Sequence, residues 1–398
     1  MRGRIFTCIG IGTRGIFAIK MNLRAPMQIA ILLVSISDLV LQIRIMKCPN
    51  NNLALLLILN YGLSLRIGTR SSKLAQTQAR QFQELFKQQH NINTEIVPID
   101  ALGDKTGVVD KTSTQNLPLA IQGVDFTGAL DEALADGVVD VVVHSLKDIP
   151  PDNRWRINVD ESKIMIGAYL RPRENPLDVL VSKEYQSIQS LPIGATVGSA
   201  SIRRQAQLLA CRPDLEIMNI RGNIDARLAA LERGEVDGLI LAFAGLNRLG
   251  ILLDDNTKYK YNPIPADVLL PGAGQGIVAI TCRTDDAKTI SFLQEIDNHD
   301  NRIAATTERS FLDSVDHLSP WSGRPPVAAL MSPPAIGDEF WNFRGLLATP
   351  DGSRVLTVNE TMHCSHCNEV DAFKLGREAA TNLLKQAGDH FLEDYYKQ

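Results

Sequence analysis

The chain has 398 residues, of which 44% are hydrophobic and 22% charged, with 28 glycines and 19 prolines. This balance is that of an ordinary globular protein of two or three domains, and it excludes a collagen, a coiled-coil rod and a wholly disordered chain. The formal net charge of −4 gives no basic character that would favour a nucleic-acid-binding protein.

The first 62 residues differ in composition from the rest. They hold seven basic residues against the single acid Asp38, a local charge of +6, so the other 336 residues carry −10. The aliphatic runs over 27–43 and 53–59 are too short or too interrupted for a membrane span. A basic, acid-poor start is typical of a targeting segment, and an untranslated leader is the alternative. We exclude residues 1–62 from the folded protein and expect a plastid (chloroplast) location, with the cytoplasm as the alternative.

The six cysteines, at positions 8, 48, 211, 282, 364 and 367, are too scattered for a disulfide framework, which favours a reducing compartment. Only Cys364 and Cys367 lie close together, in a His-Cys-Ser-His-Cys run over 363–367. A structural zinc site usually needs four ligands, and no second Cys-x-x-Cys pair exists. A surface loop with two thiols is therefore favoured over a zinc site, and no metal is expected.

From Leu63 onward short aliphatic runs alternate with amphipathic stretches of helical period. The first series predicts strands over 63–67, 95–99, 138–144, 164–170 and 178–181 and helices over 73–88 and 126–135. A second series predicts strands over 196–197, 216–219 and 238–242 and helices over 202–210 and 225–233. A strand over 277–281 follows, then a helix over 303–315, strands over 340–347 and 355–359, and a final helix over 371–388.

A strand, a turn of small polar residues and a helix form the βα unit of an open α/β sheet, whose ligands bind at the carboxyl ends of the strands. The link over 171–176 holds two prolines, which favours a crossover between domains. We expect an α/β protein of three domains, the first two doubly wound and facing a cleft. The expected bounds are 63–172 with 272–296 for domain 1, 173–271 for domain 2, and 297–398 for a small α+β domain 3.

Basic and hydroxyl residues recur at four strand-to-helix turns. Free N–H groups at a helix N-terminus bind anions there, and Arg binds carboxylate or phosphate with two bonds. A single exposed Arg is usually a solvated surface residue, but four such turns predict a cleft for a ligand with several negative groups. No glycine-rich nucleotide-binding motif accompanies them. The turn residues are Arg70, Ser72, Ser201, Arg203, Arg204, Arg221, Arg227 and Arg248.

The segment over 144–150 follows a strongly β-branched strand, which places Lys147 and Asp148 near the mouth of the cleft. Lys147 adds a cation to the anion-binding groups. Asp148 would repel a polyanion, but it would stabilise a positive charge that develops during a reaction. An ion pair that holds a nearby Arg in place is the equal alternative for Asp148. The glycine-rich turn over 270–276 is either a strand crossing between domains or a ligand contact.

Six stretches, in order along the chain, resemble the porphobilinogen deaminase (hydroxymethylbilane synthase) family. The resemblance runs from about Leu65 to the C-terminus, and its stretches are 65–72, 143–150, 201–205, 220–223, 244–250 and 274–276. It implies three α/β domains, the first two arranged like a type II solute-binding protein. The implied transferase joins four porphobilinogen molecules head to tail and releases ammonia each time, as part of tetrapyrrole synthesis for heme and chlorophyll.

The resemblance also implies roles for single residues. Asp148 is implied to stabilise the cationic methylene-pyrrole left when ammonia departs, while Lys147 and the basic turn residues hold the acetate and propionate groups of the pyrroles. Phe126 is implied to pack against the pyrroles, and Gln275 to lie in the hinge between domains 1 and 2. The implied partners are porphobilinogen and oligopyrrole intermediates, bound by a monomer without nucleic acid or membrane.

One departure concerns the dipyrromethane cofactor, which the family attaches through a thioether to a cysteine of a Gly-Gly-Cys-x-x-Pro loop. The preceding Glu-Arg-Ser-Phe-Leu motif is present over 308–312 and Pro326 matches the end of the loop, but Gly323 occupies the cysteine position. Glycine cannot form a thioether. The sequence leaves two functions open: an active transferase of this family, or a catalytically impaired paralogue or mis-spliced product that binds polycarboxylates.

Overall fold

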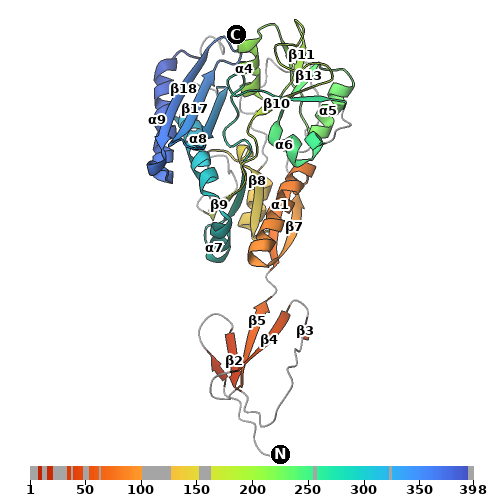
Figure 1. The fold of residues 1–398 in the computed structure, drawn as a ribbon, viewed down its shortest axis with the longest axis vertical. Coiled ribbons are helices and arrows are strands. Elements are labelled where there is room, and N and C mark those ends of the chain that lie inside the picture. The colour runs from red at the N-terminus through yellow and green to blue at the C-terminus, as the bar shows by residue number, and fades with distance from the viewer. Residues whose placement is uncertain are drawn as a thin grey trace, which may run out of the picture. The chain divides into compact units, whose positions relative to one another are not determined.

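The computed structural model describes residues 8–10, 16–20, 34–36, 39–47, 53–61, 64–100, 127–151, 163–253, 258–321 and 325–392. The chain divides into two compact units, residues 1–65 with 90–95 and residues 66–89 with 96–398. Figure 1 shows the elements in chain order, coloured from red to blue.

The N-terminal unit holds a five-stranded sheet in the order β1-β2-β5-β4-β3, with every recorded pairing antiparallel. Its strands are β1 (Cys8–Gly10), β2 (Ile16–Lys20), β3 (Val34–Ile36), β4 (Leu39–Lys47) and β5 (Leu53–Tyr61). The aliphatic run over 53–59 lies within β5. Removal of this region as a targeting segment stays a prediction.

A second five-stranded sheet, here the first lobe sheet, has the order β7-β6-β8-β15-β9. β6 and β8 are parallel, whereas β15 lies antiparallel between β8 and β9. Its strands are β6 (Ser64–Arg70), β7 (Asn93–Ile99), β8 (Val141–Ser145), β9 (Ile164–Leu170) and β15 (Val278–Arg283), and its helices are α1 (Lys73–His90), α3 (Gly128–Ala135) and α7 (Ala287–Ile296). The valines of β8 are buried, as expected for a central strand.

The second lobe sheet repeats this arrangement in the order β12-β11-β13-β10-β14. β11 is parallel to β12 and β13, and β10 lies antiparallel between β13 and β14. Its strands are β10 (Asp178–Ser182), β11 (Thr196–Gly198), β12 (Glu216–Met218), β13 (Gly238–Ala242) and β14 (Lys260–Pro263), and its helices are α4 (Ile202–Cys211), α5 (Ile224–Glu232) and α6 (Phe243–Arg248). The α/β fold class is confirmed, with one antiparallel strand inserted in each lobe sheet.

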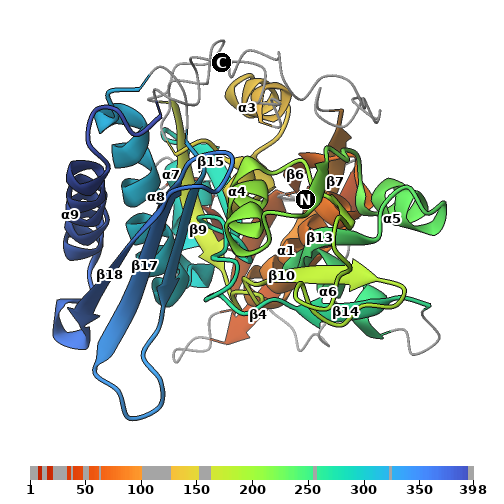
Figure 2. The ribbon, with the colours of Figure 1, turned by 90° about the horizontal axis from the view of Figure 1, so that it is seen from above.

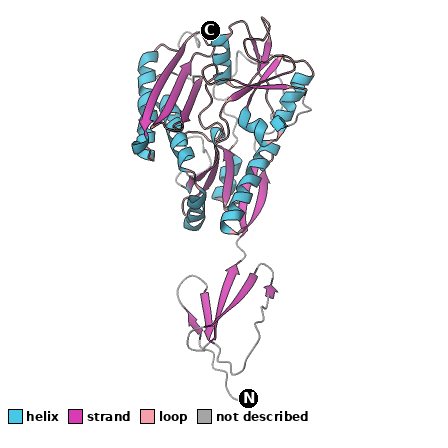
Figure 3. Ribbon diagram, in the orientation of Figure 1, coloured by secondary structure: helices cyan, strands magenta, loops and turns pink. Residues whose placement is uncertain are grey.

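The C-terminal region is a three-stranded antiparallel sheet, β16 (Val327–Ser332), β17 (Phe340–Ala348) and β18 (Val355–His363), in chain order. The helices α8 (His299–Leu318) and α9 (Glu369–Ala387) pack against each other and against this sheet (Figures 2 and 3). Phe311 of α8 meets Phe343 of β17 edge to face, with ring centroids 5.2 Å apart in a fully buried core. On the other face of this sheet, Leu346 and its neighbours pack against Ala206 of α4.

Most differences from the predicted elements lie at their ends. α8 begins at His299 instead of 303 because the Asn298 side chain accepts a hydrogen bond from the Asn301 N–H and caps the helix. β8 begins at Val141 instead of 138 because the Asp140 side chain turns toward Arg66 and accepts its backbone and guanidinium N–H groups. The residue pattern did not predict β14, β16 or α7, nor the strands β1–β5 within residues 1–62.

Two segments connect the lobe sheets, residues 171–177 after β9 and 264–277 before β15. They run side by side, because the Glu174 N–H donates to the Gly276 carbonyl oxygen over 3.1 Å. Gly276 has φ +91°, and a Cβ at this position would lie 2.2 Å from the Glu174 carbonyl oxygen. Only glycine therefore permits this approach, and the predicted crossing between domains at 270–276 is present.

Candidate active site

The segment after β8 brings Asp148 into a pocket at the carboxyl end of the first lobe sheet. Residues 146–148 form a short 3-10 turn, held by the Leu146 N–H donating to the Ile277 carbonyl oxygen over 3.0 Å. The turn aims Asp148 at the start of α1, where Arg70 and Ser72 lie. The pocket is lined by Arg70, Ser72, Leu74, Ala75, Gln78, Val143, His144, Ser145 and Asp148.

Asp148 and Arg70 form the charged pair of this pocket. The Arg70 Nη1 lies 3.4 Å from the Asp148 Oδ2, and the two side chains are 19% and 27% exposed. The pair is long for a charged hydrogen bond, and both groups reach solvent, so a ligand can approach them. The ion pair considered as an alternative for Asp148 therefore exists, and its setting leaves the carboxylate accessible to a reacting group.

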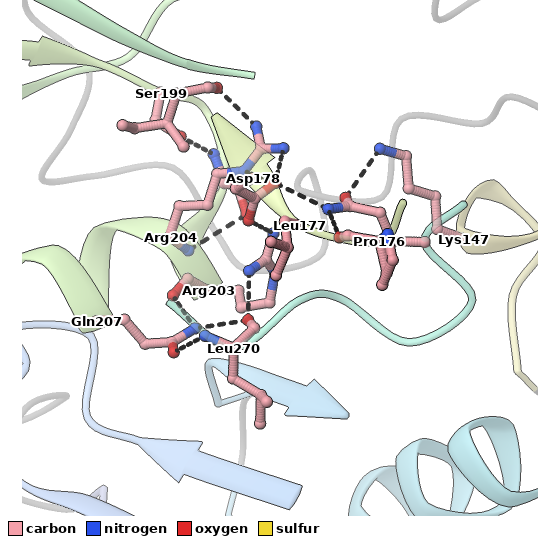
Figure 4. Close-up of polar contacts among 12 residues, drawn as sticks. Lys147, Pro176, Leu177, Asp178, Ser199, Arg203, Arg204, Gln207 and Leu270 are labelled. Carbon is pink, nitrogen blue, oxygen red and sulfur yellow. Dashed lines mark hydrogen bonds and ion pairs between the residues drawn. The ribbon is translucent and has the colours of Figure 1, made fainter. Parts of the chain in front are cut away.

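A second carboxylate, Asp178, joins the basic residues at the start of α4. Its side chain is fully buried at the beginning of β10. The Arg203 Nη2 donates to its Oδ2 over 2.8 Å, and the Arg204 Nη2 and Nε donate to its Oδ1 over 2.6 and 3.2 Å (Figure 4). Burial by itself raises the pKa of the Asp178 carboxyl, but the two guanidinium groups outweigh it and hold the pKa far below its usual range.

One further donor nitrogen of each arginine reaches a backbone carbonyl. Arg203 Nη1 donates to the Leu270 oxygen over 2.6 Å, and Arg204 Nη1 donates to the Ile240 oxygen over 2.9 Å. The arginines are 8% and 6% exposed. Ser201 caps α4, because its hydroxyl accepts from the Arg204 N–H. The structure thus places Ser201, Arg203 and Arg204 together, as the motif predicted, but within an internal network built on Asp178.

Lys147 and Gln275 extend this network to the first lobe sheet. Lys147 Nζ donates to Gln275 Oε1 over 3.2 Å, and Gln275 Nε2 donates to Asp178 Oδ1 over 2.9 Å and to the Pro176 oxygen over 2.6 Å. Burial, with a contribution from Arg204, lowers the pKa of Lys147 to about 8, against the opposing effects of Asp148 and Asp178. Two buried arginines therefore contact the Asp178 carboxylate directly, and Lys147 is linked to it through Gln275.

Two other predicted arginines lie on helices of the second lobe, Arg227 in α5 and Arg248 at the end of α6. Arg227 Nε donates to the Gly222 oxygen over 2.8 Å, and Arg248 Nη2 donates to the Gly276 oxygen over 2.7 Å. Burial, followed by the positive charges of Arg204 and Arg221, lowers the pKa of Arg227 to about 10, while the nearby Asp148 opposes this shift. Basic groups of the second lobe sheet thus lie within electrostatic range of Asp148.

Two predicted site residues, Phe126 and Gly323, lie outside the described residues. Asp178 is a residue of the site that was not predicted from the sequence. It stands at the start of a predicted strand and close to two prolines in the preceding link. An acid placed where a buried strand begins needs a partner, and the neighbouring turns supply only basic groups.

The described thiols lie away from the Asp148 pocket. Cys282 is buried in β15, Cys211 is exposed at the end of α4, and Cys364 and Cys367 follow β18. In the described ranges no three His, Cys, Asp or Glu side chains are grouped to hold a metal ion. No helix among the same residues is long and apolar enough to cross a membrane.

Comparison with known proteins gives matches both to a family model and to single proteins. The family model described as porphobilinogen deaminase, dipyromethane cofactor binding domain, matches residues 65–291. The porphobilinogen deaminases of Nitrobacter winogradskyi and Nitrobacter hamburgensis are each 38% identical over 331 residues, covering 82% of this chain and 94% of theirs. The periplasmic aliphatic sulphonate binding protein of Escherichia coli matches in structure at 16% identity and a TM-score of 0.36, over 64% of this chain and 71% of that one.

Proposed function

The chain belongs to the porphobilinogen deaminase family, and we propose that its cleft joins porphobilinogen molecules head to tail, releases one ammonia for each, and yields hydroxymethylbilane. The observation that carries this proposal is one accessible carboxylate, Asp148, in contact with Arg70 and within electrostatic range of Lys147 and Arg227. The alternative of a catalytically impaired polycarboxylate-binding paralogue is not favoured.

The cationic groups suit the substrate. Each porphobilinogen carries an acetate and a propionate, so a chain of pyrroles is a polyanion. Arg70 and Arg221 are partly exposed, and Lys147 and Arg227 lie close to Asp148. The lowered pKa values of Lys147 and Arg227 reflect burial of like charges, and a bound carboxylate relieves that unfavourable charge.

Asp148 is suited to the chemical step. When ammonia leaves porphobilinogen, the remaining methylene-pyrrole carries a positive charge. A carboxylate fixed beside that carbon stabilises the cation more than the neutral substrate, and so lowers the barrier. Its oxygen can also accept the proton that the attacked pyrrole carbon loses. The Arg70 contact orients the carboxylate, and its 3.4 Å length leaves Asp148 free to bond a pyrrole N–H.

The cofactor implied by the family is a dipyrromethane that supplies the first two pyrroles of the chain. Its carboxylates match the cationic groups of the cleft, with Lys147, Arg221 and Arg227 as the holding residues. Its thioether attachment is not matched, because no described cysteine lines the Asp148 pocket and Gly323 stands at the family's attachment position. Lys147, Arg221 and Arg227 are therefore assigned to holding the pyrrole carboxylates.

The decisive experiment measures porphobilinogen consumption and ammonia release by the purified chain and by its Asp148→Ala variant. We expect consumption that the variant loses while it still binds porphobilinogen. Binding without consumption by the unaltered chain would overturn the proposal in favour of a polycarboxylate-binding protein. In parallel, the intact mass of the protein reports an attached dipyrromethane. We expect Gly323→Cys to gain that mass only when the surrounding loop is also restored to the family pattern.

A further inference from the structure

The turn between β18 and α9 brings together two thiols that the proposed function does not use. Cys364 is exposed and Cys367 is half buried against the core formed by α8, α9 and β17. The Cys367 N–H donates to the Cys364 carbonyl oxygen over 3.2 Å and closes the turn. A turn closed in this way keeps the two Cα atoms within about 7 Å, inside the range that a disulfide bridges.

The turn is anchored on both sides, which restricts the relative positions of the two thiols. Before it, the Cys364 N–H donates to the Glu339 oxygen over 2.8 Å, and the Ser365 N–H donates to His363 Nδ1 over 3.1 Å. After it, the Asn368 side chain accepts from the Asp371 N–H over 3.0 Å and caps α9. Burial raises the pKa of the Cys367 thiol, and the charges of Asp300 and of the nearby Cys364 add to this effect.

We propose that Cys364 and Cys367 form a reversible dithiol–disulfide couple, oxidised by a low-molecular-weight disulfide such as glutathione disulfide and reduced by a dithiol. The exposed Cys364 thiolate attacks the external disulfide, forms a mixed disulfide and releases one glutathione thiolate. The Cys367 thiolate then attacks the Cys364 sulfur and releases the second glutathione. The protein loses two electrons and two protons, and the two glutathione molecules take them up.

The position of each thiol decides its role. Cys364 reaches solvent and can meet an external disulfide, whereas Cys367 is partly covered by the core and lies within the turn. Exposed disulfides of this kind are the readily reduced ones. Because the ring encloses only two residues, the bond constrains little of the unfolded chain, so this couple serves oxidation and reduction more than folding stability.

The test uses the full chain and an internal control. The protein is equilibrated in glutathione buffers of increasing oxidation, quenched with N-ethylmaleimide and digested with trypsin. Cleavage after Arg354 and Lys374 releases both cysteines in one peptide, 355–374. We expect this peptide to lose two hydrogens by forming an internal disulfide, whereas the exposed Cys211 takes up only glutathione. A peptide that stays doubly alkylated, or keeps one glutathione, would overturn the proposal.

Two further comparisons identify the attacking thiol and show whether the folded turn, and not only the spacing of the cysteines in the sequence, favours the disulfide. In Cys367→Ser the reaction should stop at a persistent glutathione adduct on Cys364, which identifies the attacking thiol. The equilibrium constant for oxidation should be at least about tenfold larger in the folded chain than in the free peptide 355–374, because the anchored turn holds the thiols together. An equal or smaller constant in the folded chain would show that the turn does not prepare the pair.

Discussion

Arg173 and Glu308 form a buried, two-pronged ion pair that ties the first crossover segment to α8. Arg173 Nη1 and Nη2 donate to Glu308 Oε1 and Oε2 over 2.7 and 3.1 Å. The same carboxylate accepts the Gly274 N–H over 2.6 Å and the Met331 N–H over 2.7 Å. One fully buried side chain therefore joins both crossover segments to the three-stranded sheet.

Glu308→Gln should be strongly destabilising. The neutral amide cannot balance Arg173 and cannot accept all four N–H donors, and breaking a buried ion pair typically costs about 3–5 kcal/mol. Urea unfolding of the full chain measures the change. Glu232→Gln, which breaks an exposed pair with Lys258, is the control and should change the unfolding free energy little. Equal effects of the two substitutions would contradict this account.

Asp178→Asn should also be destabilising, by about 3–5 kcal/mol, because it leaves Arg203 and Arg204 buried without a counter-charge. Asp214→Asn is a matched control, since Asp214 accepts two bonds from Arg212 at comparable distances but on the surface. Its effect should be small. A similar midpoint of urea unfolding for both variants would show that Asp178 is not needed to hold the two arginines.

Because the pKa of Asp178 is lowered, its ion pairs with Arg203 and Arg204 make the free energy of unfolding depend on pH. Its folded value lies below the ordinary value of 3.8, so the unfolded chain binds the proton first as pH falls. The stabilisation is complete above pH 3.8 and is lost progressively below it. The unfolding free energy of the unaltered chain should fall more steeply than that of Asp178→Asn in acid. Parallel curves down to the acid transition would contradict the assignment.

Asp148→Ala should lower kcat by at least about 10²-fold, because the lost carboxylate acts on charge that develops in the reaction. Substrate binding and the thermal unfolding midpoint should change little, since Asp148 is partly exposed and contacts Arg70 at 3.4 Å. Steady-state kinetics with porphobilinogen, equilibrium binding and thermal unfolding test the three points. Asp136→Ala, in an exposed position outside the pocket, is the control. An unchanged kcat would remove Asp148 from the mechanism.

Lys147 should produce an alkaline limb in the pH profile. Its folded pKa of about 8 means that the ammonium, the form that binds carboxylates, is lost as pH rises through that value. We expect kcat/KM to fall there by the equivalent of about 1.5–3 kcal/mol, the size of one charged hydrogen bond. Lys147→Met should lack this step, whereas Lys288→Met at an exposed position should keep it. If Lys147→Met kept the fall in kcat/KM near pH 8, another group would be responsible for it.

The lowered pKa of Lys147 also makes stability depend on pH, and the direction is the same as for the lowered pKa of Asp178. Because the folded pKa of Lys147 is below the ordinary 10.5, the unfolded chain keeps the proton between these values. The unfolding free energy contributed by this residue therefore rises as pH goes from about 8 to 10.5. Lys147→Met should gain stability over the unaltered chain at neutral pH, and the difference should shrink in alkali, as measured by urea unfolding.

Local patterns predicted most of the lobe sheets and the cluster of basic turns. Apolar runs and turns of small polar residues are patterns of consecutive residues. They could therefore predict the strands near Val142 and Leu239 and the helix start at Ser201. The partners of Asp178 could not be anticipated, because they lie 25 and 26 residues away along the chain and only the folded sheet brings them to it. For the same reason the arginines of α4 were expected to face a ligand, whereas their donors reach an internal carboxylate and backbone oxygens.

The close approach of Gly276 to Glu174 limits how the protein can change shape. The two crossover segments are joined by a backbone hydrogen bond at a point where no side chain fits, so neither can slide along the other without breaking it. Rotation about this point does not break the hydrogen bond between Glu174 and Gly276. Any change in the relative position of the two lobe sheets that keeps this hydrogen bond must therefore turn about Glu174 and Gly276, where the displacement is smallest.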